Sequence, residues 1–218
     1  MESVLDLSLK DAAMLGVNQR LILQSIDWDF YERVLKNYES SNELHFAYDD
    51  GTLEVEVPRF EHERPAQVLR DLVSNICIER EIDCLNAGST TFRRREKLKG
   101  VEPDTCFYIQ NEALIRGLRN IDLSQNPPPD LVIEVDISSP SLNKMPIYAA
   151  LGVTEVWLYK GEEVVFHELS DGFYRNVEAS VALPFLDVDT ANAFLKRGLT
   201  ARFLEWTKAV RDWARRDD

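Results

Sequence analysis

Residues 129–136 alternate between apolar and polar positions in a way that predicts a central β-strand. Successive side chains on a strand point to opposite faces. The apolar face of this strand would carry Leu131, Ile133, Val135 and Ile137. The opposite face carries Glu134 and Asp136. A buried charge is costly unless it is paired or binds a metal. Two carboxylates two residues apart on an interior strand therefore indicate a cation site.

The same criterion predicts other elements along the chain. Asp50-Gly51 lies between two alternating segments and predicts a hairpin, with Glu54 and Glu56 facing solvent. Apolar spacing predicts a helix over residues 63–81, with Pro65 in its first turn. Further strands are predicted over residues 89–95, 102–109, 153–159, 163–169 and 173–179, and further helices after Asn143 and over residues 190–216.

Consecutive strands followed by a crossover helix predict an α/β fold, a mixed sheet with helices packed on it. Residues 1–40 are rich in apolar side chains without a clean period, and we expect an N-terminal helical extension there whose first part, residues 1–17, is a loosely attached arm. The main domain would span residues 41–195, and a C-terminal helical tail residues 196–218.

Composition narrows the class of protein. The chain has 218 residues, 44% of them hydrophobic, and no apolar run comes near the roughly 18 residues of a membrane span. The N-terminus lacks a secretory pattern. The cysteines, Cys77, Cys84 and Cys106, show no CxxC spacing, which argues against a zinc site and favours a reduced compartment. We therefore expect a cytoplasmic protein without a membrane partner.

The net charge of −13 argues against a protein that coats nucleic acid nonspecifically, because phosphate contacts supply most such affinity. It leaves room for a nucleic-acid enzyme with a local basic patch. The dense basic cluster in the middle of the chain consists of Arg93, Arg94, Arg95, Lys97 and Lys99. By its pattern this cluster is a solvated loop or a phosphate contact.

Three residues together indicate metal-assisted hydrolysis of a phosphodiester. Asp104 lies near the start of one predicted strand, Glu134 in the middle of the next, and Lys144 in the first turn of the following helix. Adjacent strands can bring the two acids to a shared ion, and Mg²⁺ prefers carboxylate oxygens with open water positions. A metal-bound water beside a lysine suits phosphodiester hydrolysis.

Several polar residues of these segments also have a purely structural interpretation. Asp104 could cap a turn, and Lys144 could be an ordinary exposed helix lysine. Asp136 could form a salt bridge with Lys144 or an arginine. Of the histidines, His62 is assigned a local bond at its helix start, and His45 and His167 are read as structural strand residues.

The segment Pro103-Asp104 followed by Glu134-Val135-Asp136 resembles the PD-(D/E)xK pattern of restriction-endonuclease-like nucleases. More narrowly, the chain resembles the Uma-two family within that superfamily, over roughly residues 45–195. The segments that carry the resemblance are residues 49–54, 61–63, 102–104, 129–135, 138–141 with Lys144 and Tyr148, and 152–158. The resemblance implies an α-β-β-β-α-β core, with Asp104 and Glu134 binding Mg²⁺ or Mn²⁺.

The chain departs from the superfamily pattern at one position. Asp136 stands where the superfamily has a lysine, and the resemblance implies that Lys144 has taken over its role. Asp136 would otherwise be a third ligand, or the site would be inactive. Glu63 is the candidate for the acid that the superfamily often places on its first helix. Tyr148, one turn after Lys144, would orient the lysine or simply pack.

Competing functions remain at this point. The first is a Mg²⁺-dependent DNA endonuclease that contacts DNA through Arg93, Arg94, Arg95 and Lys97. The second is a non-catalytic binding or regulatory member of the same fold. A third is a hydrolase of a smaller phosphate ester, which would not need to follow a long phosphate backbone. Nucleases of this type often act as dimers, and an exposed strand pair near Trp157 could form the contact of a homodimer.

Overall fold

The fold is that of a computed structural model, which describes residues 20–38, 44–57, 59–137 and 142–216. The predicted arm at residues 1–17 lies outside this part of the chain. One sheet has the strand order β1 (Arg20–Leu23), β3 (Thr52–Glu56), β2 (His45–Asp49), β6 (Lys99–Val101) and β5 (Phe92–Arg94). The other has the order β11 (Phe173–Val177), β10 (Val164–Ser170), β9 (Glu155–Tyr159), β8 (Leu131–Val135), β7 (Thr105–Tyr108) and β4 (Leu85–Asn86). We call these the first and second sheets.

The described helices flank these sheets. They are α2 (Trp28–Tyr38), α3 (Phe60–Glu79), α4 (Glu112–Ile115), α5 (Met145–Leu151), α6 (Val188–Gly198) and α7 (Phe203–Ala214), with a short 3₁₀ turn at Arg95–Lys97. Among the elements of the second sheet and the helices on its two faces, the order α3–β4–β7–β8–α5–β9 matches the predicted α-β-β-β-α-β core. β5 and β6, which follow β4 in the chain, belong to the first sheet. β7 pairs antiparallel with β4 and β8, and β8 pairs parallel with β9 after the α5 crossover. The expected α/β fold with a mixed sheet is confirmed.

β8 is the buried central strand that its pattern predicts, because all five of its residues are buried. Leu131, Ile133 and Val135 pack into the core beneath α3, together with residues of α6 and α7. Val132 packs on the opposite face, in a second core formed with α5. The two faces therefore separate as the alternation predicts, except that Ile137 lies beyond the end of the strand and is exposed. Glu134 is buried on the α5 side of the sheet.

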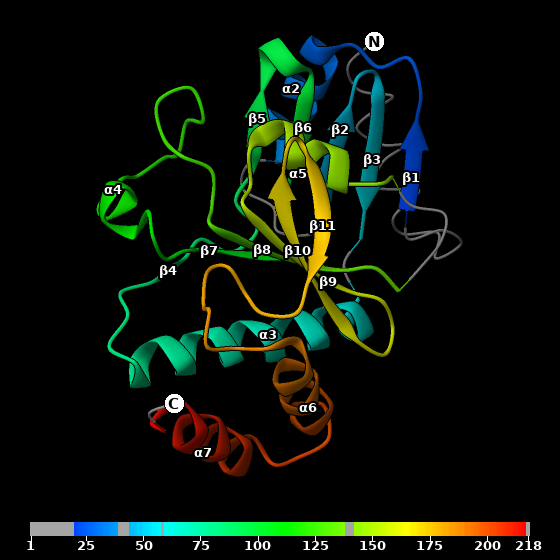
Figure 1. Cartoon of the computed structure of the whole chain (residues 1–218). Coiled ribbons are helices and arrows are strands. Elements are labelled where there is room, and N and C mark those ends of the chain that lie inside the picture. Colours follow the sequence, from blue (N-terminus) through cyan, green and yellow to red (C-terminus); the bar gives the residue numbers. More distant parts are fainter. Residues whose placement is uncertain (1–19, 39–43, 58, 138–141, 217–218) are drawn as a thin grey trace.

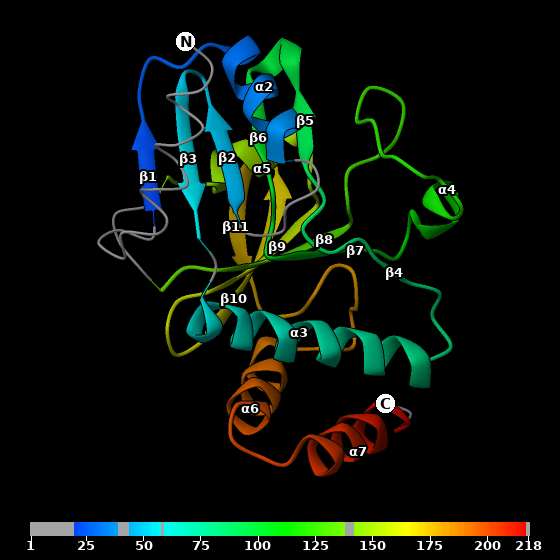
Figure 2. The same cartoon turned by 180° about the vertical axis from the view of Figure 1, so that it is seen from behind.

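The molecule is layered around the second sheet (Figure 1). One face is covered by α3, and α6 and α7 pack against α3 on its far side, as the reverse view also shows (Figure 2). The other face is covered by α5, which also contacts β5 and β6 of the first sheet. The first sheet and α2 enclose a third core of their own. The chain passes from the first sheet into the second between β6 and β7, and Asp104 lies in this link.

The N-terminal region differs from its predicted form. Residues 20–23 form a strand, β1, that pairs with β3 and extends the first sheet, so the expected helical extension at 1–40 is wrong there. Helix α2 follows, as expected. The burial of α7 residues in the α3 core shows the C-terminal helices packing on the same body. The proposed boundary at residue 195 falls inside α6.

Two further expectations are corrected by the structure. Helix α3 begins at Phe60, so Pro65 lies in its second turn and not in its first. Trp157 is fully buried and stacks on Phe166, so the expectation of a homodimer contact through this residue is not supported. Within the described residues, no helix combines the length and apolar character needed to cross a membrane.

Candidate functional site

The two predicted metal ligands meet where β7 and β8 run side by side. The register pairs Thr105 with Ile133, which places Asp104 beside Glu134. The backbone N–H of Val135 donates to Oδ2 of Asp104 at 2.7 Å. This bond fixes the Asp104 carboxylate against β8. The side chain of Asp104 is only 1% exposed, so it is a buried strand-start acid, and the turn-capping alternative does not describe it.

Lys144 points inward from the start of α5. Its Nζ lies 3.0 Å from Oε2 of Glu134, and its side chain is 12% exposed. Tyr148, one helical turn later, donates its hydroxyl proton to Oε1 of the same glutamate. Tyr148 therefore orients the glutamate, where a role in orienting the lysine was one alternative. Lys144 is the N-cap of α5, and Tyr148 lies one turn further on the same side of the helix, so both donors face Glu134. The start of the helix is fixed by Asn143, whose Oδ1 accepts from the Met145 N–H at 3.1 Å.

The charges of this group do not cancel. Burial raises the pKa of Asp104 to about 7, although Lys144 and the Val135 N–H both favour its ionised form. Burial likewise raises the pKa of Glu134 to about 7, against the attraction of Lys144 and with the charge of Asp104 adding to the rise. Burial alone would lower the pKa of Lys144, but Glu134, Asp104 and Glu56 together raise it. One lysine thus faces two carboxylates, and a further proton or cation would balance them.

A second group of polar residues borders Asp104 and was not expected to belong to the site. Glu56, the last residue of β3, and His45, the first residue of β2, are paired across the first sheet. His62, in the first turn of α3, lies 3.6 Å from Glu56 Oε1 and 3.5 Å from Asp104 Oδ1. His45 lies 3.8 Å from the same Asp104 oxygen. Burial, followed by the charge of Lys144, lowers the pKa of His45 to about 4, so this ring is neutral at pH 7.

Glu54 and Glu56 are buried, and the prediction that they face solvent is wrong. Alternation along β3 places both on one face, but it cannot show whether that face is covered. It is covered by Arg20 from β1, whose guanidinium lies 2.7 Å from Glu56 and 3.6 Å from Glu54. Glu54 also accepts the Leu142 N–H at 2.7 Å. The sequence contained a signal for this burial. Glu54 and Glu56 alternate with Leu53 and Val55, which is the same pattern that indicated a buried site at Glu134 and Asp136.

Several buried atoms of this site have no hydrogen-bond partner among the described residues. They are Glu54 Oε1, Glu56 Oε2, Asp104 Oδ1 and both ring nitrogens of His62. Buried polar atoms normally find a partner, and such exceptions call for an explanation. The residues fit a hard cation in this respect, because three of the unpartnered atoms are carboxylate oxygens and one of these belongs to Asp104. In the described part of the chain, no three His, Cys, Asp or Glu residues are spaced to enclose an ion. Mg²⁺ is commonly held by one or two carboxylates and several waters, and Asp104 with Glu134 supplies that number.

The accessory candidates lie at the margin. Asp136 is on the same strand side as Glu134, with a side chain 38% exposed and 4.0 Å from Arg20. Its position matches the predicted salt bridge with an arginine. Glu63 lies in the first turns of α3, and its charge contributes to the raised pKa of Asp104. Glu63 is therefore close enough to act on the site electrostatically.

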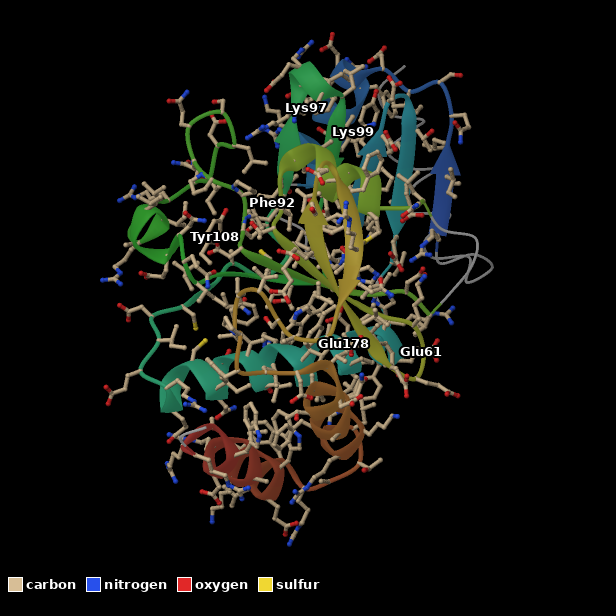
Figure 3. The ribbon with its side chains drawn as sticks, in the orientation of Figure 1. Glu61, Phe92, Lys97, Lys99, Tyr108 and Glu178 are labelled. Atoms are coloured by element: carbon tan, nitrogen blue, oxygen red, sulfur yellow. The ribbon has the colours of Figure 1, made fainter. Side chains whose placement is uncertain are left out.

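The predicted nucleic-acid contacts come from the β5–β6 region, and their donors already have partners. Lys97 and Lys99 lie near the β5–β6 hairpin, whereas Glu61 marks the start of α3 at the other end of the first sheet (Figure 3). Arg95 pairs with Asp29 and Glu32, and Arg94 donates to the Leu123 carbonyl at 2.8 Å. The other partners are Glu32 for Arg93, the Ala150 carbonyl for Lys97 and Asp49 for Lys99.

The raised pKa values predict a stability profile for the metal-free protein. In the unfolded chain the pKa is 3.8 for Asp104 and 4.5 for Glu134, against about 7 for each when folded. The folded state therefore binds more protons between these values. The resulting stability is present below about pH 4 and is lost as the pH rises to about 7. Urea unfolding in chelator at pH 5 and pH 8 measures it, and Asp104→Asn should flatten the difference. If the wild type lost no more stability between pH 5 and pH 8 than Asp104→Asn does, the result would contradict this prediction.

The comparisons with known proteins bear on this site. A solved structure described as a "putative nuclease belonging to DUF820" from Anabaena variabilis ATCC 29413 is 16% identical and covers 69% of this chain and 90% of its own, with a TM-score of 0.47. No curated protein matches significantly. The family Uma2, described as "Putative restriction endonuclease", matches residues 28–203 and so includes Asp104, Glu134 and Lys144. Because this match spans most of the chain, the protein belongs to the Uma2 family, the nuclease-like family that its motifs resemble.

Proposed function

We propose that this protein is a Mg²⁺-dependent endonuclease that hydrolyses phosphodiester bonds in DNA, with Mn²⁺ as a substitute ion. The observation that carries the proposal is the buried group of Asp104, Glu134 and Lys144. It combines two carboxylates, one of them with a free oxygen, and one lysine within bonding distance of the other. Membership of a restriction endonuclease family supports the reaction class.

Each residue would have a distinct role. Asp104 and Glu134 would hold the ion, which polarises the phosphoryl oxygen and activates water when bound. Lys144 supplies a fixed positive charge where negative charge develops on the phosphoryl group. The Val135 N–H holds Asp104 and the Tyr148 hydroxyl holds Glu134, so both carboxylates are oriented before a substrate arrives. Carboxylates have several lone-pair sites, so Glu134 can accept these bonds and still bind an ion.

The position of Lys144 supports the idea that it replaces the strand lysine of the superfamily. Asp136 stands at the usual lysine position, but its side chain lies near Arg20 at the edge of the site. Lys144 reaches the same glutamate from the helix. The charge of the missing lysine is thus present at the carboxylates, although it comes from a different element.

One observation favours the alternative, a non-catalytic binding module. Both oxygens of Glu134 are already engaged by Lys144 and Tyr148, an arrangement that also stabilises a buried acid without any ion. The basic side chains Arg93, Arg94, Arg95 and Lys97 are proposed as DNA contacts, and they would have to exchange their present partners for phosphates.

Cleavage of supercoiled plasmid and of single-stranded DNA tests the proposal. The wild type should cut at least one of these with Mg²⁺ or Mn²⁺ and neither in chelator. Well-folded wild type that cuts neither substrate with either ion would contradict the proposal and favour the binding module. Cutting that persists in chelator would contradict the dependence on a metal ion.

A further inference from the structure

A cleft of about 840 Å³ opens beside the proposed catalytic group. One wall is α5, with Met145, Pro146 and Ala149, and the floor is the outer part of the second sheet. Figure 1 shows α5 next to the β10–β11 hairpin, and the two elements are in contact. Glu134 and Lys144 line the cleft at the end nearest β8. A ligand in the cleft would therefore reach Glu134 and Lys144, two of the three residues of that group.

The floor of the cleft combines aromatic and hydrogen-bonding groups. His167 on β10 and Asn176 on β11 are direct partners in the antiparallel ladder, and both line the cleft. Burial lowers the pKa of His167, so its ring is neutral at pH 7, and its Nδ1 lies 3.1 Å from the Val165 carbonyl, which accepts from it. Phe173 and Tyr174 line the cleft from the start of β11. Phe173 is 76% exposed, so its ring is accessible to a ligand in the cleft.

The charge distribution limits how this protein can hold a nucleic acid. Many of its exposed cations are paired with acids: Arg95 with Asp29 and Glu32, Arg116 with Asp83 and Glu112, Arg211 and Arg215 with Glu79, and Lys196 with Glu163. With a net charge of −13, tracking of a long duplex backbone would be weak. Lys160 lines the cleft, and no ion pair joins it to another described residue. Cationic charge that can meet a phosphate is thus found next to the aromatic floor.

We propose that this cleft binds one unstacked base of single-stranded DNA, with the adjoining phosphate at Lys144. Stacking on an aromatic ring serves any base, because every base has a π-face. Asn176 offers a neutral amide to the edge of the base, and a cleft of this volume lies in the usual range for small-molecule sites. A base inside an intact duplex could not enter it. This inference rests on the proposed nuclease function and adds the substrate class, namely single-stranded DNA or an unpaired stretch of a duplex.

Fluorescence anisotropy with a labelled thymidine oligonucleotide of about ten nucleotides tests the cleft, with a duplex of equal length as the competitor. The measurement is made in chelator, so that no cutting occurs. The single strand should bind more tightly than the duplex. Phe173→Ala should weaken single-strand binding by about tenfold, since loss of one stacking contact is of that order. Phe203→Ala is the matched control, because Phe203 is also an exposed phenylalanine (62%) but belongs to α7 and should have no effect.

The outcomes separate this inference from the proposed function. Equal or tighter duplex binding, or a Phe173→Ala variant that binds like the wild type, would overturn the cleft as a base site, even if the protein cleaves DNA. Binding that depends on Phe173 in a protein that never cleaves DNA would support the base site and contradict the hydrolysis. Asn176→Ala provides a second variant on the cleft floor, at an exposed position, and it should also weaken binding.

Discussion

Replacement of Glu134 by glutamine should reduce DNA cleavage by roughly a thousandfold, because loss of a metal ligand removes several kcal/mol of transition-state stabilisation. The same change should leave the metal-free protein as stable as the wild type or more stable at pH 8. It removes a buried charge whose pKa burial has raised to about 7. The new amide is accommodated because the Tyr148 hydroxyl, which donates to Glu134, can turn and accept. Plasmid cleavage rates and urea unfolding measure the two effects.

Glu155→Gln is the matched control for this prediction. Glu155 is also a buried glutamate of the second sheet, with its carboxylate in the α3 core. It accepts from the Trp157 indole N–H at 2.7 Å and from the Ala182 backbone N–H at 2.8 Å. Neither donor can accept, so an amide must place an N–H against an N–H, which costs about 1–3 kcal/mol. This variant should lose stability and keep its cleavage activity. A Glu134→Gln protein that cleaves like the wild type would remove Glu134 from the mechanism.

Replacement of Lys144 by methionine should destabilise the protein by about 3–5 kcal/mol at pH 8, because it leaves buried carboxylates without their cation. The loss should shrink at pH 5, since Asp104 and Glu134 are then protonated and no longer need a counterion. Cleavage should be lost along with the charge. Urea unfolding at the two pH values measures the stability difference.

Lys196→Met is the control for the second prediction. Lys196 also pairs with a glutamate, Glu163, at 2.9 Å, but both side chains are more than half exposed. Exposed pairs contribute at most about 1 kcal/mol, so this variant should unfold like the wild type at both pH values. If Lys144→Met cost no more than Lys196→Met, the Glu134–Lys144 pair would not be the buried charge centre described above.

The sequence predicted the central features of the fold because they depend on local pattern. Alternation along residues 131–135 separates two faces, and both faces prove to be buried in different cores. Gly152 ends α5 with a φ of 85°, a conformation that glycine adopts without strain, so the end of this helix also depends on a local feature. The approach of Asp104 to Glu134 followed from the pairing of consecutive strands. These features require only neighbours in the chain or in one sheet.

The features that the sequence could not predict depend on contact between the two sheets. Glu54 and Glu56 have the alternation of a half-exposed hairpin. The contacts that bury them come from side chains of other elements, Arg20 of β1 and His62 of α3. From the sequence alone, His62 was interpreted as a residue that bonds locally at the start of its helix, because its neighbours in the chain are polar. Its closeness to Asp104 joins the first turn of α3 to the link between β6 and β7, two segments that are far apart in the sequence. Long-range packing of this kind leaves little trace in local periodicity.

The most direct test of the central claim is calorimetric titration of Mn²⁺ into the wild type and into Asp104→Asn. The claim is that the buried carboxylates, left with an excess negative charge and an unpartnered Asp104 oxygen, form a divalent cation site. The wild type should bind Mn²⁺ in a saturable manner, and Asp104→Asn should lose that binding while remaining folded. Absence of binding to the wild type, or unchanged binding to Asp104→Asn, would contradict the claim.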